Sequence, residues 1–151
     1  MTDRHAFDHF LHAQDGGVFA RALAELEEGR KRSHWMWFVF PQIEGLGHSA
    51  TARKFALTDA DEAASYAEHE ELGPRLYEAS EAMLEWAGTL SADDILGEVD
   101  AMKFRSSMTL FEAACDDDQV FVDALEAFYG GERCALTRER LAAQGKVKTW
   151  Q

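Results

Sequence analysis

Hydrophobic positions along the chain recur mainly at helical spacing. Phe19, Leu23 and Leu26 follow one another at intervals of four and three residues, and Gly29 stands where a C-terminal cap belongs. These intervals place side chains on one face of a helix. No run of alternating polar and apolar residues bounded by turns predicts a strand. The pattern therefore predicts an all-α fold.

Start and stop signals divide the rest of the chain into short and medium helices. Ser49 is expected to cap a helix that reaches Leu57, and capping boxes are expected at Thr58 with Asp61 and at Ser91 with Asp94. In Gly73-Pro74 the proline suits the first position of a helix. Further helices are expected to start after Asp100, after a cap at Asp118, and at Thr137. The expected inward stripes are Leu76, Ser80, Met83 and Ala87, then Phe104, Met108, Phe111 and Cys115, then Phe121, Leu125 and Phe128 before Gly130-Gly131. Together these signals predict roughly eight helices in a single compact multihelical domain over residues 1–151.

The longest uninterrupted apolar run extends from Trp35 to Phe40 and is followed by Pro41. Its six side chains cannot all face one side of a helix, so two interpretations stay open. The segment is core on every side, or it is shared between the core and a pocket wall. In the second case Trp35 or Trp37 offers a stacking surface to a planar ligand.

The turn after this run contains Gly45 and Gly47, which suit a tight turn. It lacks the preceding strand, the full glycine spacing and the lysine of phosphate-cradling loops, so the likeness to such a loop is superficial. Gln42 and Ser49 can still present polar atoms to a neighbouring cleft.

Composition indicates a globular domain that is large enough to fold without stabilising disulfides or metals. The 151 residues are 46% hydrophobic and 11% aromatic, and the longest apolar run is far too short to cross a bilayer. The first residues are charged and do not resemble a secretory signal. Cys115 and Cys134 agree with a reducing compartment and are interpreted as small apolar residues near helix ends. We therefore expect a cytoplasmic protein with no membrane association and no cofactor.

The net charge of -13 argues against general nucleic-acid binding and anionic-membrane binding. The charge is uneven, however. Residues 30–54 contain five cations and one anion, a balance of +4, whereas the other residues contain 10 cations and 27 anions, a balance of -17. Positive charge therefore gathers beside the aromatic run.

Two basic clusters are candidates for binding an anion. Arg30, Lys31 and Arg32 precede Ser33 and His34, and this mixture of guanidinium, hydroxyl and imidazole suits a phosphate or carboxylate. The alternative is that the cations simply complement the C-terminal end of a helix.

The second cluster is Lys103 and Arg105, near the N-terminal end of a predicted helix. Cations there oppose the helix dipole unless an anion compensates them. Glu98 and Asp100 are candidates for that anion, and a bound anion is the other, with Ser106, Ser107 and Thr109 as hydroxyl donors.

Two further patterns carry less weight. His5, His9 and His12 recur at helical spacing and could hold zinc, but a solvated helix face explains them equally well, and we expect no metal. The adjacent pairs Ser33-His34 and His48-Ser49 are not part of a G-x-S-x-G motif, which forms the strained turn that presents the serine nucleophile. This argues against a serine hydrolase.

Three blocks of the sequence resemble a known family. The segments "ALAELEEGRKRSHWMWFVFPQIEGLGHSATARKFAL", "LGPRLYEA" and "DAMKFRSSMTLFEAA" are similar to the hallmark blocks of domain of unknown function family 1810, and the resemblance covers about residues 7–141. It implies a small, single-domain, all-helical protein of bacterial or fungal type and transfers no activity. Some members are labelled calpastatin, a name that does not suit this chain, because inhibitors of that kind are extended, disordered repeats.

The leading hypothesis is a helical domain that binds a small anionic ligand, such as a nucleotide or another phosphate ester, with or without catalysis. The expected ligand-binding residues are Arg30, Lys31, Ser33, Trp35, Trp37, Gln42, Lys103, Arg105 and Ser107. His34 is the candidate acid or base if the protein is an enzyme. The competing hypothesis is a non-catalytic interaction module that docks an acidic partner or a second copy of the chain. The first hypothesis requires Lys103 to lie beside the tryptophan pair.

Overall fold

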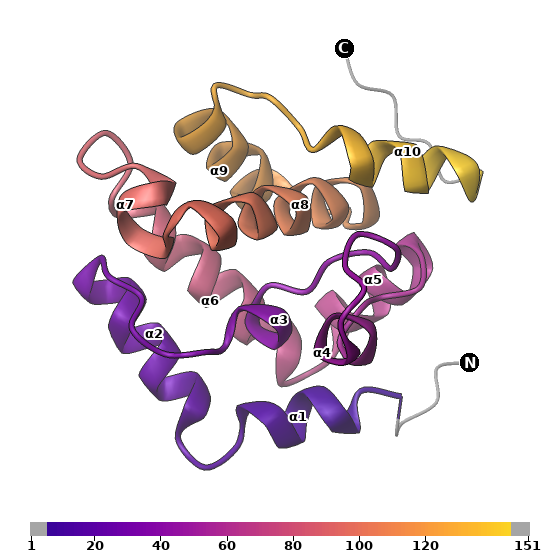
Figure 1. The fold of residues 1–151 in the computed structure, drawn as a ribbon, viewed down its shortest axis with the longest axis horizontal. Helices are drawn as coiled ribbons and strands as arrows, with labels where there is room; N and C mark the ends of the chain where they lie inside the picture. The colour runs from indigo at the N-terminus through magenta and orange to yellow at the C-terminus, as the bar shows by residue number, and fades with distance from the viewer. Residues whose placement is uncertain (1–5, 146–151) are drawn as a thin grey trace.

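The computed structural model describes residues 6–145, and these form ten helices (Figure 1). They are α1 (Asp8–Gln14), α2 (Val18–Glu28), α3 (Met36–Val39), α4 (Ala50–Lys54), α5 (Ala60–Glu68), α6 (Leu72–Leu84), α7 (Ala92–Leu96), α8 (Glu98–Ala114), α9 (Gln119–Tyr129) and α10 (Ala135–Ala143). Between residues 6 and 145 there is no strand, only an isolated bridge between Ile43 and Leu57. The predicted all-α fold is confirmed. The number of helices between residues 6 and 145 is higher than the expected eight, because some, such as the four-residue α3, are very short.

Helix α8 is the centre of the fold (Figure 1). It packs against α5, α7, α9 and α10, and α3 also touches it. Its inward stripe, Phe104, Met108 and Phe111, is fully buried, as the spacing predicted. A long central helix surrounded by shorter ones brings together segments from both ends of the chain, namely the aromatic segment and the start of α10.

Several predicted helix ends are confirmed, and others are wrong. Gly29 and Gly130 cap α2 and α9 with positive φ, and Ser91 with Asp94 forms the capping box of α7. Asp59, not Thr58, caps α5, because its carboxylate accepts the Glu62 N–H. Helix α4 ends at Lys54 and does not reach Leu57, and α6 begins at Leu72, so that Pro74 is its third residue. Ala87 lies beyond α6 and is exposed. Helix α8 begins at Glu98, before Asp100, and α10 begins directly after Cys134, before Thr137.

The aromatic segment is divided between core and surface. Trp35, Met36, Val39 and Phe40 are buried, whereas Trp37 and Phe38 are partly exposed. Pro41 ends the short helix, because the residue before a proline is pushed out of the helical conformation. Of the two interpretations, the shared segment is therefore the observed one. Across residues 6–145, no helix combines the length and apolar character that crossing a bilayer demands.

Candidate functional site

The approach to α3 is held by one buried carboxylate. Glu25 accepts hydrogen bonds from the backbone N–H groups of Arg32 and Ser33, from the Ser33 hydroxyl (2.7 Å) and from the Trp35 indole N–H (2.9 Å). Burial alone raises the pKa of Glu25, but these hydrogen bonds outweigh it and lower the pKa to about 2. The side chains of Ser33 and Trp35 are therefore used to fix the chain.

The end of α3 is held by a second set of contacts. The Phe38 carbonyl accepts hydrogen bonds from the Gln14 amide (2.8 Å) and from the Tyr66 hydroxyl (3.1 Å). Gln14 and Tyr66 are both buried and belong to α1 and α5. Because both ends of the short helix are anchored, the direction of Trp37 between them is fixed as well.

Trp37 lies against the second basic cluster. The Lys103 ammonium is 3.8 Å from the centre of the Trp37 ring, a cation–π contact. The predicted meeting of Lys103 with the tryptophan pair is therefore confirmed.

Asp100 joins the two basic clusters. Its carboxylate pairs with Lys31 at 2.9 Å and with Lys103 at 3.1 Å, and Lys31 in turn lies over the Trp35 ring. Burial alone raises the pKa of Asp100, but the two lysines lower it further than burial raises it. One carboxylate thus serves two cations, and it is the compensating anion that the sequence suggested.

The loop of residues 42–47 passes beside Trp37 and is closely fitted. The bridge to Leu57 ties it down, with Glu44 N–H donating to the Leu57 carbonyl (2.8 Å). Gly45 has φ +95°, and a Cβ there would lie 2.7 Å from the Arg140 guanidinium. At Gly47 a Cβ would lie 2.8 Å from that of Ala52. The glycines serve a tight turn, as predicted, and allow α10 and α4 to approach the loop.

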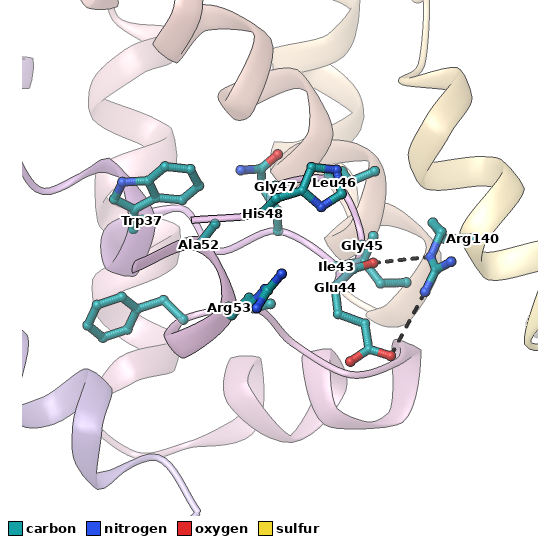
Figure 2. Close-up of a pocket in the computed structure, with 13 residues that line it drawn as sticks. Trp37, Ile43, Glu44, Gly45, Leu46, Gly47, His48, Ala52, Arg53 and Arg140 are labelled. Carbon is teal, nitrogen blue, oxygen red and sulfur yellow. Dashed lines mark hydrogen bonds and ion pairs between the residues drawn. The ribbon is translucent and has the colours of Figure 1, made fainter. Parts of the chain in front are cut away.

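One pocket lies on the α4 side of this loop, and we name it the arginine pocket. It has a volume of about 290 Å³ and is lined by Trp37, residues 42–48, Ala52, Arg53, Phe55, Ala56 and Arg140. Arg140 donates to the Glu44 carbonyl at 3.2 Å, and Arg53 lies between Trp37 and the Glu44–Arg140 pair (Figure 2). Within residues 6–145 the Arg53 guanidinium and the Gln42 amide have no hydrogen-bond or ion-pair partner. Polar groups therefore remain available in this pocket.

A second pocket lies on the α8 side, and we name it the cysteine pocket. It has a volume of about 370 Å³ and is lined by Trp37, Gln42, Leu46, Gly47, Val99, Met102, Lys103, Arg105, Ser106, Cys134, Ala135 and Leu136. Val99, Met102 and Leu136 are the large apolar side chains most exposed in the described part of the chain, at 68%, 67% and 59%. The two pockets share Trp37, Gln42, Leu46 and Gly47, so the loop and the indole form the wall between them.

The structure brings some of the predicted site residues together. Trp37, Gln42, Lys103 and Arg105 line the cysteine pocket, and Lys31 is linked to them through Asp100. Arg105 is partly engaged, because it donates to the Glu132 carbonyl (2.8 Å) and pairs with the Glu132 carboxylate.

Five predicted residues lie elsewhere. Trp35 is only 1% exposed, so it cannot offer a stacking surface, and the Ser33 hydroxyl donates to Glu25. Ser107 is fully buried in α8, and the neighbouring Ser106 faces the pocket instead. Arg30 and His34 are exposed and line neither pocket. A catalytic role of His34 would thus have to operate outside both pockets.

Sequence reasoning missed several pocket residues. Arg53 lies in the positively charged window of residues 30–54, and that charge was the available signal. Val99 and Met102 are apolar at a spacing of three on the outer face of α8, opposite the buried stripe. Arg140 and Cys134 reach the site from far along the chain, and no local pattern points to them.

The structure offers no site for a metal within residues 6–145, because no three histidine, cysteine or acidic side chains there are grouped to hold one. His5, one of the three spaced histidines, falls outside the described residues. His9 stacks on Phe55, and burial lowers its pKa.

The arrangement is suited to binding anions next to an aromatic surface. Four cations line the two pockets, and Lys31 is linked to them through Asp100, which makes five: Arg53, Arg140, Lys103, Arg105 and Lys31. Their carboxylate partners are three: Glu44, Asp100 and Glu132. The balance of +2 contrasts with the net charge of -13 of the whole chain. This face is therefore locally less negative than the rest of the chain.

Comparison with known proteins supports the family resemblance. The structure is similar to the crystal structure of the conserved hypothetical protein Rv1873 from Mycobacterium tuberculosis, with a TM-score of 0.88 and 41% identity over 93% of this chain and 99% of that chain. A search of curated proteins gives no match. Residues 4–141 match the family model described as "Protein of unknown function (DUF1810)". The chain therefore belongs to the DUF1810 family, as its three sequence blocks indicated.

Proposed function

We propose that the arginine pocket binds a small anionic ligand, such as a nucleotide or another phosphate ester, with a planar group of the ligand against Trp37. The observation that carries this proposal is the pairing of a partly exposed, anchored tryptophan with an unpaired guanidinium at Arg53. Arginine presents donors in a fork that matches phosphate and carboxylate oxygens, and an indole face suits a planar ring.

The charges around the pocket support an anion as the ligand. Arg140 is held at the rim by the Glu44 carbonyl, which leaves other guanidinium N–H groups to face a ligand. The unpaired Gln42 amide lies in the wall common to both pockets and can donate to phosphate or to a ring carbonyl. Compared with the sequence hypothesis, the cations that contact the ligand become Arg53 and Arg140 instead of Arg30 and Lys31.

The test is thermal unfolding at low salt with adenosine monophosphate, inorganic pyrophosphate and uncharged adenosine. A compound at 100 times its Kd adds about 2.7 kcal/mol to the free energy of unfolding. We expect adenosine monophosphate to stabilise the wild-type protein more than adenosine does, and Arg53→Gln to remove most of that difference. Arg21→Gln, which removes an exposed cation on α2, is the matched control. If no compound shifts the transition, or if both variants lose the shift equally, the proposal is wrong.

A second candidate function rests on a different observation. Val99, Met102 and Leu136 expose apolar surface around one pocket, and apolar surface gathered in this way is typical of a protein interface. The occupant we consider is a second copy of the chain, as in the interaction-module hypothesis. The negative charge of both copies would oppose association, so a dimer should strengthen as salt increases.

Sedimentation equilibrium at low and high salt separates this candidate from the first. A dimer that uses this surface should be lost in Met102→Glu and kept in Glu98→Gln, a change at an exposed neighbouring position of α8. A protein that stays monomeric at all salt concentrations and at high protein concentration excludes the homodimer.

A further inference from the structure

Cys134 occupies a position in which its thiol faces a pocket and a helix N-terminus together. It is the N-cap residue of α10, a helix of nine residues, and it lines the cysteine pocket. No side chain caps the first turn of α10. N–H groups at such a turn need acceptors, and a thiolate is a much stronger acceptor than a thiol.

The thiol is surrounded by hydroxyl groups. The Ser106 hydroxyl lies 3.2 Å from the Cys134 sulfur and 3.1 Å from the Met102 carbonyl, and its single proton can serve either acceptor. Thr137 is fully buried at the third position of α10, and its hydroxyl forms no hydrogen bond of standard geometry within residues 6–145. The side chain at this third helical position can reach back toward the N-cap residue, which here is Cys134. The Thr137 hydroxyl is therefore a buried donor available to the thiolate.

The segment that holds Cys134 is fixed to α8. Arg133 forms a two-pronged pair with the buried Glu112 at 2.9 and 2.6 Å, and Arg105 donates to the Glu132 carbonyl. The Cys134 N–H donates to the fully buried Thr109 hydroxyl at 3.0 Å. These contacts keep the sulfur beside Ser106 and at the pocket wall, so it is positioned before any reaction partner arrives.

We propose that Cys134 is a thiol-modification site that takes an apolar thiol carrying an anionic group as a mixed disulfide. The apolar part of the partner lies against Trp37, Met102 and Leu136, and its anionic group lies toward Lys103 and Arg105. In the reaction the Cys134 thiolate attacks one sulfur of a disulfide. The new S–S bond forms as the old one breaks, and the other half leaves as a thiolate, so no outside oxidant is needed. This proposal uses the cysteine pocket and does not rest on the proposed function of the arginine pocket.

The electrostatic surroundings of Cys134 agree with this role. Burial alone raises the pKa of the Cys134 thiol, but the Ser106 and Thr137 hydroxyl groups and the Thr137 and Leu136 N–H groups outweigh it and lower that pKa. Cys115 provides the internal contrast, because it is the C-cap residue of α8 and lines neither the arginine pocket nor the cysteine pocket.

The test is the rate of reaction with two disulfides of opposite charge. Dithiobis(nitrobenzoate) is aromatic and anionic, and cystamine is cationic. Each rate is divided by that of 2-mercaptoethanol, an uncharged thiol, with the same reagent, which removes the difference in leaving group. We expect Cys115→Ser to keep one fast-reacting thiol and Cys134→Ser to lose it. We also expect the normalised rate with dithiobis(nitrobenzoate) to exceed that with cystamine, although the net charge of -13 favours cystamine.

Variants around the thiol sharpen the test. Ser106→Ala and Thr137→Val should each slow the fast thiol several-fold at neutral pH and shift its pH–rate profile upward, because each removes a donor to the thiolate. Lys103→Met should reduce the preference for the anionic disulfide, and Arg21→Gln should not. Mass spectrometry of the modified wild-type protein locates the adduct even if a variant fails to fold. Modification mainly at Cys115, or a fast thiol that survives in Cys134→Ser, overturns the proposal. A normalised preference for cystamine overturns the assigned partner class.

Discussion

Trp35 and Trp37 are separated by one residue, yet they belong to different parts of the molecule. Each has a lysine over its ring, Lys31 at 5.3 Å and Lys103 at 3.8 Å, and both lysines pair with Asp100. The Trp35 indole N–H is bonded to Glu25, and the ring is buried. Trp37 is partly exposed in the wall between two pockets. The same cation and indole chemistry is therefore structural at Trp35, where the N–H is satisfied and the ring is buried, whereas Trp37 keeps part of its ring open to solvent, as the proposed ligand site requires.

The largest effect should come from breaking the Trp35 side at Glu25. Glu25→Gln replaces one acceptor oxygen by a donor that faces other donors, and we expect it to lower the free energy of unfolding by about 3 kcal/mol at neutral pH. The native pKa of Glu25 is about 2, below its usual value of 4.5, so its stabilisation is present above about pH 4.5 and is lost as the pH falls toward 2.

Urea unfolding at several pH values measures this difference. Wild type and Glu25→Gln should converge as the pH falls below about 4.5. Glu27→Gln, an exposed change on the same helix, is the control and should match wild type throughout. A constant gap between Glu25→Gln and wild type at every pH would contradict the role given to the carboxylate.

A matched pair of substitutions tests the two tryptophans directly. Trp35→Phe should cost about 2 kcal/mol of unfolding free energy, because it removes buried volume and a donor to Glu25. Trp37→Phe should cost less than about 1 kcal/mol, because its ring is only partly buried. Urea unfolding of both variants decides the matter, and equal losses would mean that Trp37 is also a structural residue.

Asp100 should link both sides of the comparison. Asp100→Asn leaves the Lys31 ammonium, whose side chain is only 10% exposed, without its counter-charge. We expect a loss of about 1.5 kcal/mol in stability. The same change removes a negative charge next to the Lys103–Trp37 contact, so adenosine monophosphate should bind more tightly than to the wild type. Isothermal titration and urea unfolding measure the two effects, and a variant that is both stable and unchanged in binding would show that the shared carboxylate is unimportant.

A smaller effect than that of Asp100→Asn should come from the loop beside Trp37. Gly45→Ala introduces a side chain at φ +95° and crowds Arg140, and we expect a cost of about 1 kcal/mol. Because Arg140 must shift, the thermal shift with adenosine monophosphate should shrink as well. Gly88→Ala is a control with a similar positive φ of +82° and open space for the new Cβ, so it should cost similar stability and leave the thermal shift unchanged.

Much of the fold follows from the sequence, and the site follows from it only in part. The stripe of Phe104, Met108 and Phe111 predicts the central helix because its burial is a local property of spacing. The meeting of Lys103 with Trp37 was expected from charge and aromatic content, but the sequence could not distinguish Trp35 from Trp37. Trp35 is set apart by its hydrogen bond to Glu25, ten residues earlier in the chain.

Residues brought from far along the chain were beyond sequence reasoning. Arg140 reaches the loop at Glu44 across 96 positions, and Cys134 reaches Ser106 across 28. Neither contact leaves a periodic or motif signal, because each depends on how α10 packs beside α8. Arg53 differs in this respect, since the cationic window already contained it.

The most direct test of the central claim is a two-dimensional NMR titration of the tryptophan indole N–H signals with adenosine monophosphate. The chain has four tryptophans, and Trp→Phe variants assign their signals. We predict that the Trp37 signal moves with saturable dependence on adenosine monophosphate while the Trp35 signal, locked to Glu25, stays in place. If the Trp37 signal does not move while the protein remains folded, or if the Trp35 signal moves just as far, the distinction between a structural and a ligand-facing tryptophan is wrong.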